Sequence, residues 1–444
     1  MTQSKNFSYT EPSYSQARDT GRLRELRHFL HNRLIDAMEE EGIHLLKDPQ
    51  LLEQKLSELI ADIRPKLNPA LSSDEKNLIR QQIMQELTGM GPISDLMNET
   101  DITDILINGP DEIWVDKNGR LTRTNLQFDN ERHLRLFLDR ILGVQGRQLD
   151  ARQPMVDARL PDGSRLHAII PPLCEIGPIV SIRRFHSEKL TAEQLVNKGF
   201  LNQKMMDFLQ LSVAAGINIV IAGSASAGKT TLLNVISGFI PSSERIVTVE
   251  ETAELQLNHP HVIPLESRHV NSEGYGAVTL SDLVRNALRM RADRIVVGEV
   301  RGIEVLDMLQ AMNVGHDGSL TTLHANSPKD VISRMETLAL MGDSGFSRGA
   351  IQQMIAASIQ LIVQVMRFRD GSRRIVSISE LVRHDDNNEI RELFTFRHDS
   401  NNTLDTISGK HISLGKPTEL ANKVAAKGYT SKQFNDLLQA ESLC

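Results

Sequence analysis

The sequence predicts an α/β protein in which a C-terminal domain with a mostly parallel sheet follows a helical domain and a smaller α+β domain. From about residue 201, short apolar runs alternate with amphipathic segments, as in strand–helix crossover units. Before that point, strand patterns are separated by hairpin signals, and earlier still leucine and isoleucine recur at helical spacing. The expected divisions are a disordered tail at 1–20, a helical domain at 21–90, an α+β domain at 91–186, a linker at 187–200 and the parallel-sheet domain at 201–444.

The N-terminal helices are predicted from apolar residues three and four positions apart. The third helix has a capping box at its start, because Ser72 is followed three residues later by Glu75. Gly89, Gly91 and Pro92 are typical of its end. We expect the apolar stripes to form the core of a bundle rather than a groove for a partner. The stripe residues are Leu23, Leu26, Leu30, Leu34, Leu52, Leu56, Leu59, Ile63, Leu78, Ile79, Ile83 and Leu87.

The α+β domain is predicted from two hairpins, two further strands and a helix. EIWVD and RLTRT flank residues 117–119, and Asn-Gly between strand-like runs is a hairpin signal. VDARL and RLHAII flank the turn residues Pro-Asp-Gly-Ser at 161–164. Strands are also expected at 102–109 and 179–185, and a helix at 131–142. The expected linker at 187–200 leads into a helix, for which Thr191 and Gln194 are a candidate cap.

Charge, cysteine content and hydropathy exclude several classes of protein. The 50 Lys and Arg against 57 Asp and Glu give a net charge of −7, which disfavours a protein that coats nucleic acid. Cys174 and Cys444 form no disulfide framework and no four-thiolate zinc site, so we interpret them as unpaired thiols in a reducing cytoplasm. The apolar runs are far shorter than the about 20 residues of a bilayer span. We expect a cytoplasmic protein without direct membrane insertion, whose membrane role would depend on a partner.

The strongest motif fits G-x-x-x-x-G-K-[ST], a phosphate-binding loop, between the buried strand INIVIA and the helix KTTLLNVISGF. Backbone N–H groups and a helix N-terminus together form an anion cradle for the phosphates of a nucleotide. Lys229 can reach the β- and γ-phosphates, and the hydroxyl of Thr230 can bind Mg²⁺. The predicted nucleotide-binding residues of the loop are Gly223, Ser224, Ala225, Ser226, Ala227, Gly228, Lys229, Thr230 and Thr231.

Acidic residues end two strands that follow the loop. Glu299 comes at the end of RIVV, where open parallel sheets bind ligands, and could hold Mg²⁺ or orient the attacking water. RIVTVEETAEL ends in Glu250, Glu251 and Glu254. From the residues alone, this second cluster could be a solvated charge run or a catalytic edge. Glu250 and Glu254 are therefore candidate catalytic residues beside Glu299.

Two histidines flank a Ser/Thr-rich stretch in NVGHDGSLTTLHANS. His316 and His324 lie eight residues apart without a nearby cysteine, so a zinc site is not favoured. A single histidine is more often a structural residue. Neutral histidine can also donate to a phosphate or carboxylate, so both are candidates for sensing the γ-phosphate.

These four segments, in this order, resemble the secretion ATPases of the type II/type IV superfamily, which drive pilus assembly and secretion. The family's Walker A loop, acidic box, Walker B segment and histidine box correspond to GSASAGKT, VEETAEL, RIVVGEVRG and GHDGSLTTLHANS. The strongest resemblance is to the tight-adherence (Tad/Flp) pilus assembly ATPases of the CpaF/TadA type. LTGMGPISDLM, ITDILINGPDEIWV, DARLPDGSRLHAIIPPL and IVSIRRF are also similar to that family. Ser226 stands where the family has glycine, and Glu251 where it usually has aspartate.

The resemblance implies a RecA-like P-loop ATPase domain preceded by a PAS-like α+β domain. It implies Mg²⁺-dependent ATP hydrolysis by a homohexamer at the cytoplasmic face of the bacterial inner membrane, acting on pilus platform proteins. In the family, arginines of the N-terminal domain reach the γ-phosphate. The matching residues are Arg159, Arg165, Arg183 and Arg184, which without the resemblance would be interpreted as surface charges.

Three alternatives stay open from the sequence. A VirB11-like type IV secretion motor shares every motif, although the hairpin-rich N-terminal segment favours the pilus ATPases. A nucleic-acid motor on the same fold is disfavoured by the charge and by the lack of aromatic-rich basic stretches. An ATP-binding regulator with little hydrolysis is kept open by the departures at Ser226 and Glu251.

Overall fold

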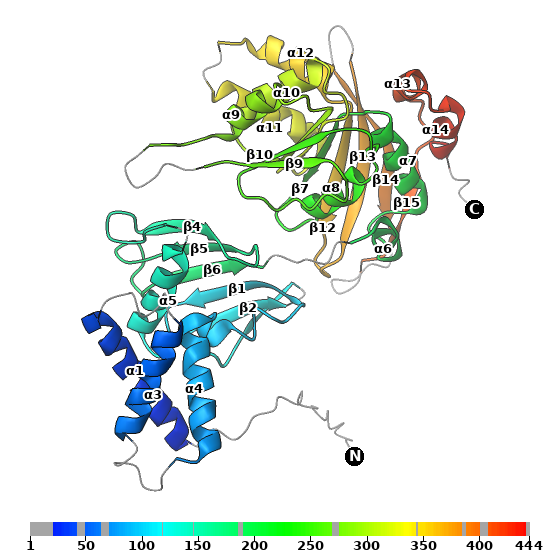
Figure 1. Ribbon diagram of the computed structural model, residues 1–444. Coiled ribbons are helices and arrows are strands. Elements are labelled where there is room, and N and C mark those ends of the chain that lie inside the picture. The colour runs from blue at the N-terminus through cyan, green and yellow to red at the C-terminus, as the bar shows by residue number, and fades with distance from the viewer. Residues whose placement is uncertain are drawn as a thin grey trace, which may run out of the picture. The chain divides into compact units, whose positions relative to one another are not determined.

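The computed structural model divides the chain into two compact units, 1–186 and 187–444, which are described separately (Figure 1). Within the described residues, no helix has the length and apolar composition that a membrane span needs. The structure describes residues 21–41, 49–63, 71–117, 119–144, 146–184, 190–268, 275–342, 345–383, 388–399 and 407–440. The predicted tail at 1–20, Asn118 of the first hairpin and Cys444 lie outside these residues.

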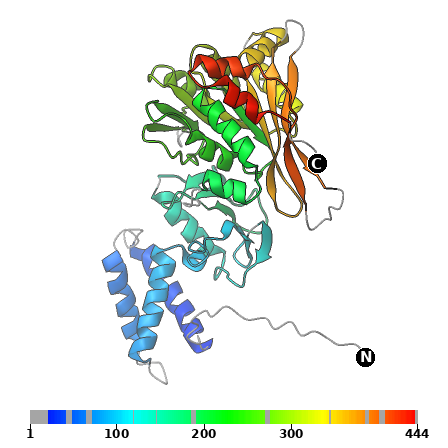
Figure 2. The same cartoon turned by 90° about the vertical axis from the view of Figure 1, so that its right-hand side faces the viewer.

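The first unit begins with three helices that pack side by side, as Figures 1 and 2 both show. They are α1 (Gly21–Glu41), α3 (Pro49–Ile63) and α4 (Ser73–Thr88). Most of the predicted stripe residues form their shared core, in which Leu34, Leu56 and Ile83 are fully buried. Leu78 is not part of this core, and the side chain of Ile63 lies outside the described part of the chain. The capping box is also confirmed: the Ser72 N–H donates to Glu75 Oε2 at 2.7 Å, and the Glu75 N–H donates to Ser72 Oγ at 3.1 Å.

A six-stranded antiparallel sheet follows in the same unit, after a short 3₁₀ turn, η2 (Gly91–Ile93). Its spatial order is β3-β2-β1-β6-β5-β4, and both predicted hairpins are confirmed as β2–β3 and β4–β5. Helix α5 (Glu131–Gly143) packs its apolar face on the sheet through buried residues such as Leu134 and Leu138. The strands are β1 (Ile102–Asn108), β2 (Ile113–Lys117), β3 (Arg120–Arg123), β4 (Met155–Arg159), β5 (Arg165–Ile169) and β6 (Ile179–Arg183).

The second unit is built on a nine-stranded sheet of order β15-β14-β13-β12-β7-β11-β10-β8-β9. The predicted parallel sheet is confirmed, because the strands from β12 to β9 in this order all run parallel. These strands are β7 (Ile219–Gly223), β8 (Ile246–Glu250), β9 (Val262–Glu266), β10 (Arg294–Val300), β11 (Leu320–Leu323) and β12 (Leu361–Arg367).

Helices cover both faces of this sheet, so its central strands are apolar on both sides. Along β7, Ile219 and Ile221 face one core and Val220 and Ala222 face the other. The first core is shared with α6 (Ala192–Asn197), α7 (Gln203–Ala214), α8 (Lys229–Ser237), α13 (Leu420–Ala426) and α14 (Ser431–Leu437). The second is shared with α9 (Leu280–Ala287), α10 (Glu304–Asn313), α11 (Pro328–Leu340) and α12 (Arg348–Ser358).

The predicted Thr191–Gln194 cap is confirmed as a capping box at the start of α6. Two features of the second unit were not predicted. The described part of the expected linker, 190–200, buries Leu195 and Phe200 in the core of this unit. An antiparallel extension, absent from the sequence-based prediction, also widens the sheet beyond β12. It consists of β13 (Arg373–Val382), β14 (Glu389–His398) and β15 (Gly409–Ser413).

Candidate functional site

The predicted phosphate loop connects a buried strand to a helix. β7 ends at Gly223 and α8 begins at Lys229, so residues 224–228 form the connecting turn. Gly228 caps α8 with a φ of 99°, in the left-handed region that favours glycine. The loop thus lies at the carboxyl end of a central parallel strand, where the free N–H groups and partial positive charge of a helix N-terminus favour an anion.

Both glycines of the motif are restricted, Gly223 by close packing and Gly228 by its positive φ and a tight contact. A Cβ atom on Gly223 would lie 2.4 Å from the backbone oxygen of Val365, on the neighbouring strand β12. A Cβ atom on Gly228 would lie 3.2 Å from Cε2 of Phe200. Packing, and at Gly228 also the backbone conformation, therefore favours glycine at both positions.

Ser226, which replaces the family's central glycine, has a φ of 57°. A side chain in this left-handed region costs about 1–2 kcal/mol relative to ordinary backbone. The guanidinium of Arg373, at the start of β13, donates from Nε to the backbone oxygen of Ser226 at 2.8 Å. The loop keeps a glycine-like conformation here, and a contact from the antiparallel extension helps to hold it.

Lys229 is 7% exposed and folds back along the loop. Its Nζ donates to the backbone oxygens of Ser224 at 3.0 Å and Gly223 at 3.2 Å, and lies 3.4 Å from Nδ1 of His324. Burial lowers the pKa of Lys229, and the nearby Glu299 opposes this shift. Because the ammonium contacts only uncharged groups here, two carbonyls and an imidazole whose pKa is lowered, its charge is available to a phosphate. Thr230 and Thr231 are half-buried in the first turn of α8.

Glu299 lies near the end of β10, inside the strand rather than just past it. One carboxylate oxygen accepts a hydrogen bond from Nη2 of Arg301 at 2.7 Å. The other, Oε1, lies 2.8 Å from Nε2 of His324, which directly follows β11. Burial and the neighbouring ammonium of Lys229 lower the pKa of His324, which favours the neutral imidazole. Lys229, His324 and Glu299 thus form a continuous row at the carboxyl ends of β7, β11 and β10.

The acidic segment lies at the same edge of the sheet, because β8 pairs in parallel with β10. Glu251 Oε2 accepts a hydrogen bond from Nη1 of Arg301 at 3.0 Å, so this arginine joins the two acidic segments. Glu254 acts on the same guanidinium through its charge and helps to raise the pKa of Arg301, after the larger effect of Glu299. The cluster is therefore part of the loop's edge rather than a solvated charge run.

Glu250 differs from these carboxylates because it is buried. Its Oε1 accepts hydrogen bonds from the N–H groups of Glu254 and Leu255, both at 2.9 Å. Burial raises the pKa of Glu250 to about 7, although these two hydrogen bonds oppose the shift. Its side chain holds the turn that carries Glu251 and Glu254, so the structure favours a positioning residue over a direct catalytic role.

We expect Glu250→Gln to make the protein more stable than wild type above neutral pH. In the wild type, the raised pKa means that unfolding releases a proton between about pH 4.5 and 7, so Glu250 destabilises the folded chain progressively over that range. Glutamine can still accept both N–H groups but carries no charge. The advantage should be absent near pH 4 and reach up to about 3 kcal/mol by pH 8. Thermal unfolding of both proteins across this range measures it, and a pH-independent difference would contradict it.

His316 is not part of this edge of the sheet, so its prediction as a catalytic residue is corrected. It precedes β11, whereas His324 follows it, and β11 runs parallel to β7 with Leu323 opposite Ala222. His316 therefore lies at the end of the sheet where β7 begins, away from the phosphate loop. Its N–H donates to the backbone oxygen of Ala311 at 3.3 Å, and its carbonyl accepts from Ser319 Oγ at 2.8 Å. These contacts assign it to the turn after α10.

In the first unit, three of the four predicted arginines lie in one row across the sheet. Arg159 on β4 pairs with Arg165 on β5, which pairs with Arg183 on β6. Residues opposite one another share a face, so three positive charges gather on the side away from the apolar core. Arg165 contacts Asp157 and Arg183 contacts Asp104, each with a nitrogen–oxygen distance of 3.3 Å.

Arg184 lies outside the row, and its inclusion with the other three is corrected. It follows Arg183 directly, and consecutive strand residues point to opposite faces. Its Nη1 donates to the backbone oxygens of Leu96 and Glu99, in the segment before β1. The guanidinium thus ties that segment to the sheet.

Sequence reasoning missed two arginines of the second unit. Arg301 lies between Glu299 and Glu251, and Arg373 holds the phosphate loop. Both of these cations lie beside the site in addition to Lys229. Arg301 could have been found from its place two residues after Glu299 on one strand end, whereas the contact of Arg373 depends on the unpredicted extension.

The comparisons with known proteins agree with this geometry. Residues 86–395 match the family described as "Type II/IV secretion system protein", which is most of the chain. The chain belongs to this family. The parallel sheet and phosphate loop of the second unit form its RecA-like domain, and the chain is accordingly a secretion ATPase.

Named relatives extend the similarity over most of their own length. This secretion ATPase is 40% identical over 315 residues to the "Putative conjugal transfer protein" of Mycobacterium tuberculosis, covering 69% of this chain and 89% of that protein. It is 32% identical to the type IV secretion system protein PtlH of Bordetella pertussis, covering 64% of this chain and 91% of that protein. The solved VirB11 ATPase of Brucella suis is 26% identical, with a TM-score of 0.36 over 65% of this chain and 95% of that one.

Proposed function

We propose that this secretion ATPase is the motor of a tight-adherence (Tad/Flp) pilus. It works as a Mg²⁺-dependent homohexamer at the cytoplasmic face of the bacterial inner membrane and acts on the pilus platform proteins there. The row of Lys229, His324 and Glu299 beside the phosphate loop carries the proposed chemistry. The similarity of four segments within residues 87–185 to the pilus ATPases carries the assignment to the pilus.

Residues of the second unit would bind and orient ATP. The N–H groups of residues 223–231 would bind the α- and β-phosphates, and the Lys229 ammonium would offset the charge of the β- and γ-phosphates. Glu299 would orient the attacking water, directly or through the neutral His324. Arg301 would hold Glu299 and Glu251 at the edge of the site through the two hydrogen bonds described above.

The side chains near the loop fit a Mg²⁺ ion. This ion prefers hard oxygen ligands, and the Thr230 hydroxyl and Glu299 carboxylate supply them from the first turn of α8 and the end of β10. When bound, Mg²⁺ would neutralise charge on the β- and γ-phosphates. Since Arg301 and His324 already contact the Glu299 carboxylate, we expect Thr230 to be the direct ligand and Glu299 to act on the ion's water shell.

We further propose that the arginine row of the first unit completes the site on assembly. Phosphoryl transfer commonly uses an arginine to offset the charge that develops on the γ-phosphate. Arg159, Arg165 and Arg183 present three such groups on one face of one sheet. Arg165 and Arg183 already contact Asp157 and Asp104, so a bound phosphate would share these guanidiniums with the two carboxylates.

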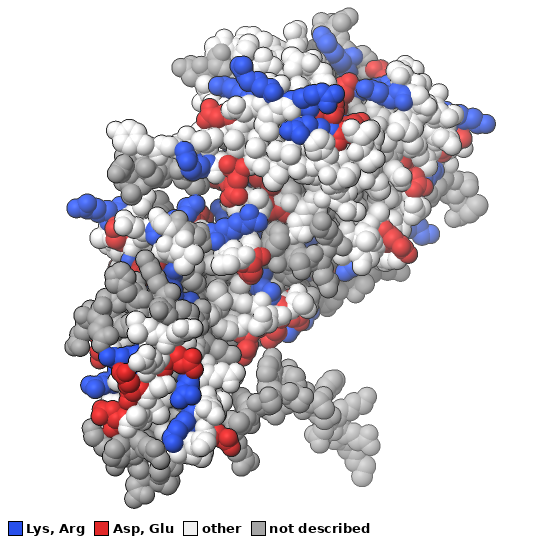
Figure 3. All heavy atoms as spheres, viewed as in Figure 1, with Lys and Arg blue, Asp and Glu red and all other residues white. Residues whose placement is uncertain are grey.

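A VirB11-like role in type IV secretion is the second candidate, and the names of two relatives, PtlH and VirB11, favour it. A nucleic-acid motor is less well supported. On the face that Figure 3 shows, described basic and acidic side chains alternate in small groups, whereas nucleic-acid binding favours a basic stripe. An ATP-binding regulator is disfavoured by the left-handed Ser226, which keeps the loop conformation despite the lost glycine.

A chromosomal Lys229→Ala allele in the source bacterium separates the two candidates. The pilus proposal expects surface pili to disappear while the amount of the ATPase is unchanged and type IV secretion or conjugation continues. Lys410→Ala, an exposed change on β15, is the matched control and should leave the pili intact. Normal pili together with lost secretion would overturn the pilus assignment in favour of the VirB11-like one.

A further inference from the structure

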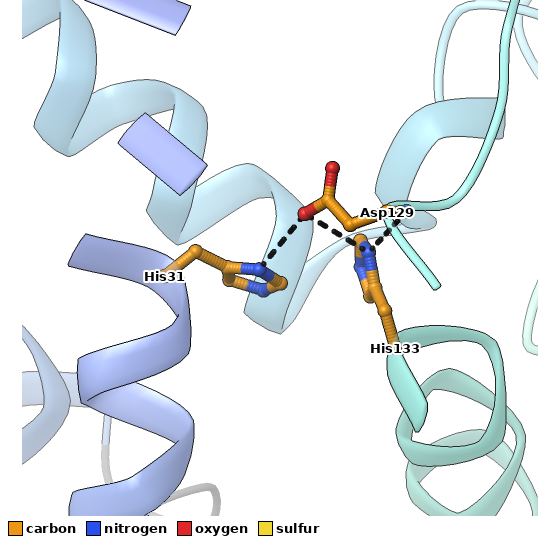
Figure 4. Close-up of side chains that lie close together, drawn as sticks. All are labelled: His31, Asp129 and His133. Carbon is orange, nitrogen blue, oxygen red and sulfur yellow. Dashed lines mark hydrogen bonds and ion pairs between the residues drawn. The ribbon is translucent and has the colours of Figure 1, made fainter. Parts of the chain in front are cut away.

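Two histidines and an aspartate meet in the first unit, far in sequence from the motifs of the secretion ATPase (Figure 4). His31 comes from the middle of α1, and His133 from the first turn of α5. Asp129 precedes α5 and lies between the two imidazoles. Each residue has one potential metal-ligand atom, a ring nitrogen or a carboxylate oxygen, and these three atoms lie within 4.8 Å of one another. The cluster thus joins a helix of the bundle to the helix that packs on the sheet.

The local chain fixes this arrangement. Asn130 caps α5 by accepting a hydrogen bond from the His133 N–H at 2.9 Å, which sets the backbone of the histidine. Phe128 is fully buried, and its ring meets that of His133 edge-on at 5.1 Å between centroids. The ring of His31 meets that of His133 in the same way at 4.5 Å. The imidazoles are therefore held in place by packing.

His31 is buried, and the described part of the chain offers its ring nitrogens no hydrogen-bond partner, which points to a ligand. The residue is 1% exposed, and among the described residues neither of its ring nitrogens has a hydrogen-bond partner. Buried polar nitrogens almost always have such a partner, because burial removes their hydrogen bonds to water. Nδ1 of His31 approaches Asp129 Oδ2 to 3.2 Å, but without the geometry of a hydrogen bond. A cation between these two atoms would supply the missing interaction of Nδ1.

The distances fit a tetrahedral metal ion. In a zinc site, metal–nitrogen and metal–oxygen bonds of about 2.0–2.2 Å place neighbouring ligand atoms about 3.4 Å apart. The two Nδ1 atoms lie 3.2 Å (His31) and 3.5 Å (His133) from the same carboxylate oxygen of Asp129. The N–H of Asp129 also donates to Nδ1 of His133 at 3.3 Å, so that nitrogen carries the lone pair that a metal needs. An ion would replace this long contact.

We propose that His31, Asp129 and His133 bind a divalent transition-metal ion, with Zn²⁺ as the best match. Two imidazoles and one carboxylate are ligands that Zn²⁺ accepts, and they leave its fourth position to water. Asp129 is the partly exposed member, at 27% of its side chain, so the ion enters from its side. The bound ion fastens α1 to α5 and adds to the nearby surface contact between Arg132 and Asp36, at 3.3 Å.

Metal binding by the full-length chain tests this proposal. The protein is stripped with a chelator, kept free of nucleotide and Mg²⁺, and titrated with Co²⁺ and then Zn²⁺. We expect one Co²⁺ per chain with the visible absorption of tetrahedral coordination, displacement by Zn²⁺, and a higher melting temperature with Zn²⁺. Asp129→Asn keeps the shape of an exposed side chain and should weaken binding at least about tenfold, as should His31→Ala.

Matched variants separate this cluster from other metal-binding groups. His167 and Asp157 form a histidine–aspartate pair, 3.1 Å apart, on the sheet of the same unit, but without a second histidine. His167→Ala should bind Co²⁺ as wild type does. Asp36→Asn removes the neighbouring α1–α5 contact and should retain the Zn²⁺-dependent rise in melting temperature. The proposal is overturned if the wild type binds no Co²⁺ at micromolar concentration, or if Asp129→Asn binds it equally well.

Discussion

Lys229→Ala should reduce ATP hydrolysis by about 10³-fold or more while leaving the protein folded. The ammonium lies inside the phosphate loop, where it contacts two backbone carbonyls and the ring of His324, and its charge would act on the β- and γ-phosphates. Within the loop, residues 223–231, no other side chain is basic. Phosphate release by purified protein measures the loss, and circular dichroism checks the fold.

Lys410→Ala is the control for loss of a lysine, since this exposed residue lies on β15 at the far edge of the sheet. It should hydrolyse ATP at the wild-type rate. A folded Lys229→Ala protein with full activity would show that residues 223–231 do not bind the reacting phosphates, and the proposed chemistry would fail with it.

Glu299→Gln should retain ATP binding but lower hydrolysis by about two to four orders of magnitude. Glutamine keeps the size of the side chain, but it cannot draw a proton from water or hold the charge that Arg301 and His324 contact. Because the phosphate loop is unchanged, nucleotide affinity should stay within a few-fold of wild type. Binding of a fluorescent ATP analogue and single-turnover phosphate release measure the two effects separately.

Glu254→Gln is the matched comparison, because Glu254 is also a carboxylate of this edge and acts on Arg301 through its charge. We expect a smaller loss than for Glu299→Gln, since Glu254 lies on the turn that Glu250 holds rather than in the row with Lys229 and His324. If Glu254→Gln proves the more damaging change, the acidic segment supplies the base and Glu299 has a positioning role.

The phosphate loop could be predicted because all its signals are local. The strand Ile219–Gly223, the glycines and the helix that begins at Lys229 are contiguous, and each has its own sequence pattern. The parallel order of the sheet then places Glu299 and His324 at the same edge, since both lie at the carboxyl ends of strands that run parallel to β7. Local patterns and one topological rule were sufficient for this part of the site.

The wrong predictions concern residues that were expected to lie together in space because they belong to one sequence motif. His316 and His324 belong to one sequence motif, but β11 separates them and carries them to opposite ends of the sheet. Arg183 and Arg184 are neighbours in sequence, yet the strand alternation places only Arg183 in the arginine row. The position of a motif residue in the fold depends on where it lies along its strand and on which face of the strand its side chain points.

Other features could not be predicted because they depend on residues far apart in the chain. Arg301 meets Glu251 across fifty positions, through the pairing of β8 with β10. Arg373 contacts the phosphate loop from the antiparallel extension, which the sequence-based prediction did not include. His31 and His133 lie on separate helices, and only the packing of the bundle against α5 brings them to Asp129.

Steady-state phosphate release by the full-length chain, measured over a range of protein concentrations with Mg²⁺ and ATP, tests the central claim most directly. An assembled motor should show a specific rate that rises with protein concentration as rings form, and then levels off. The rate should depend on Lys229 at every concentration and fall when Arg159, Arg165 and Arg183 are changed together to alanine. Phosphate release no greater than that of Lys229→Ala, across the whole range, would contradict the proposal that this chain is an ATP-hydrolysing motor.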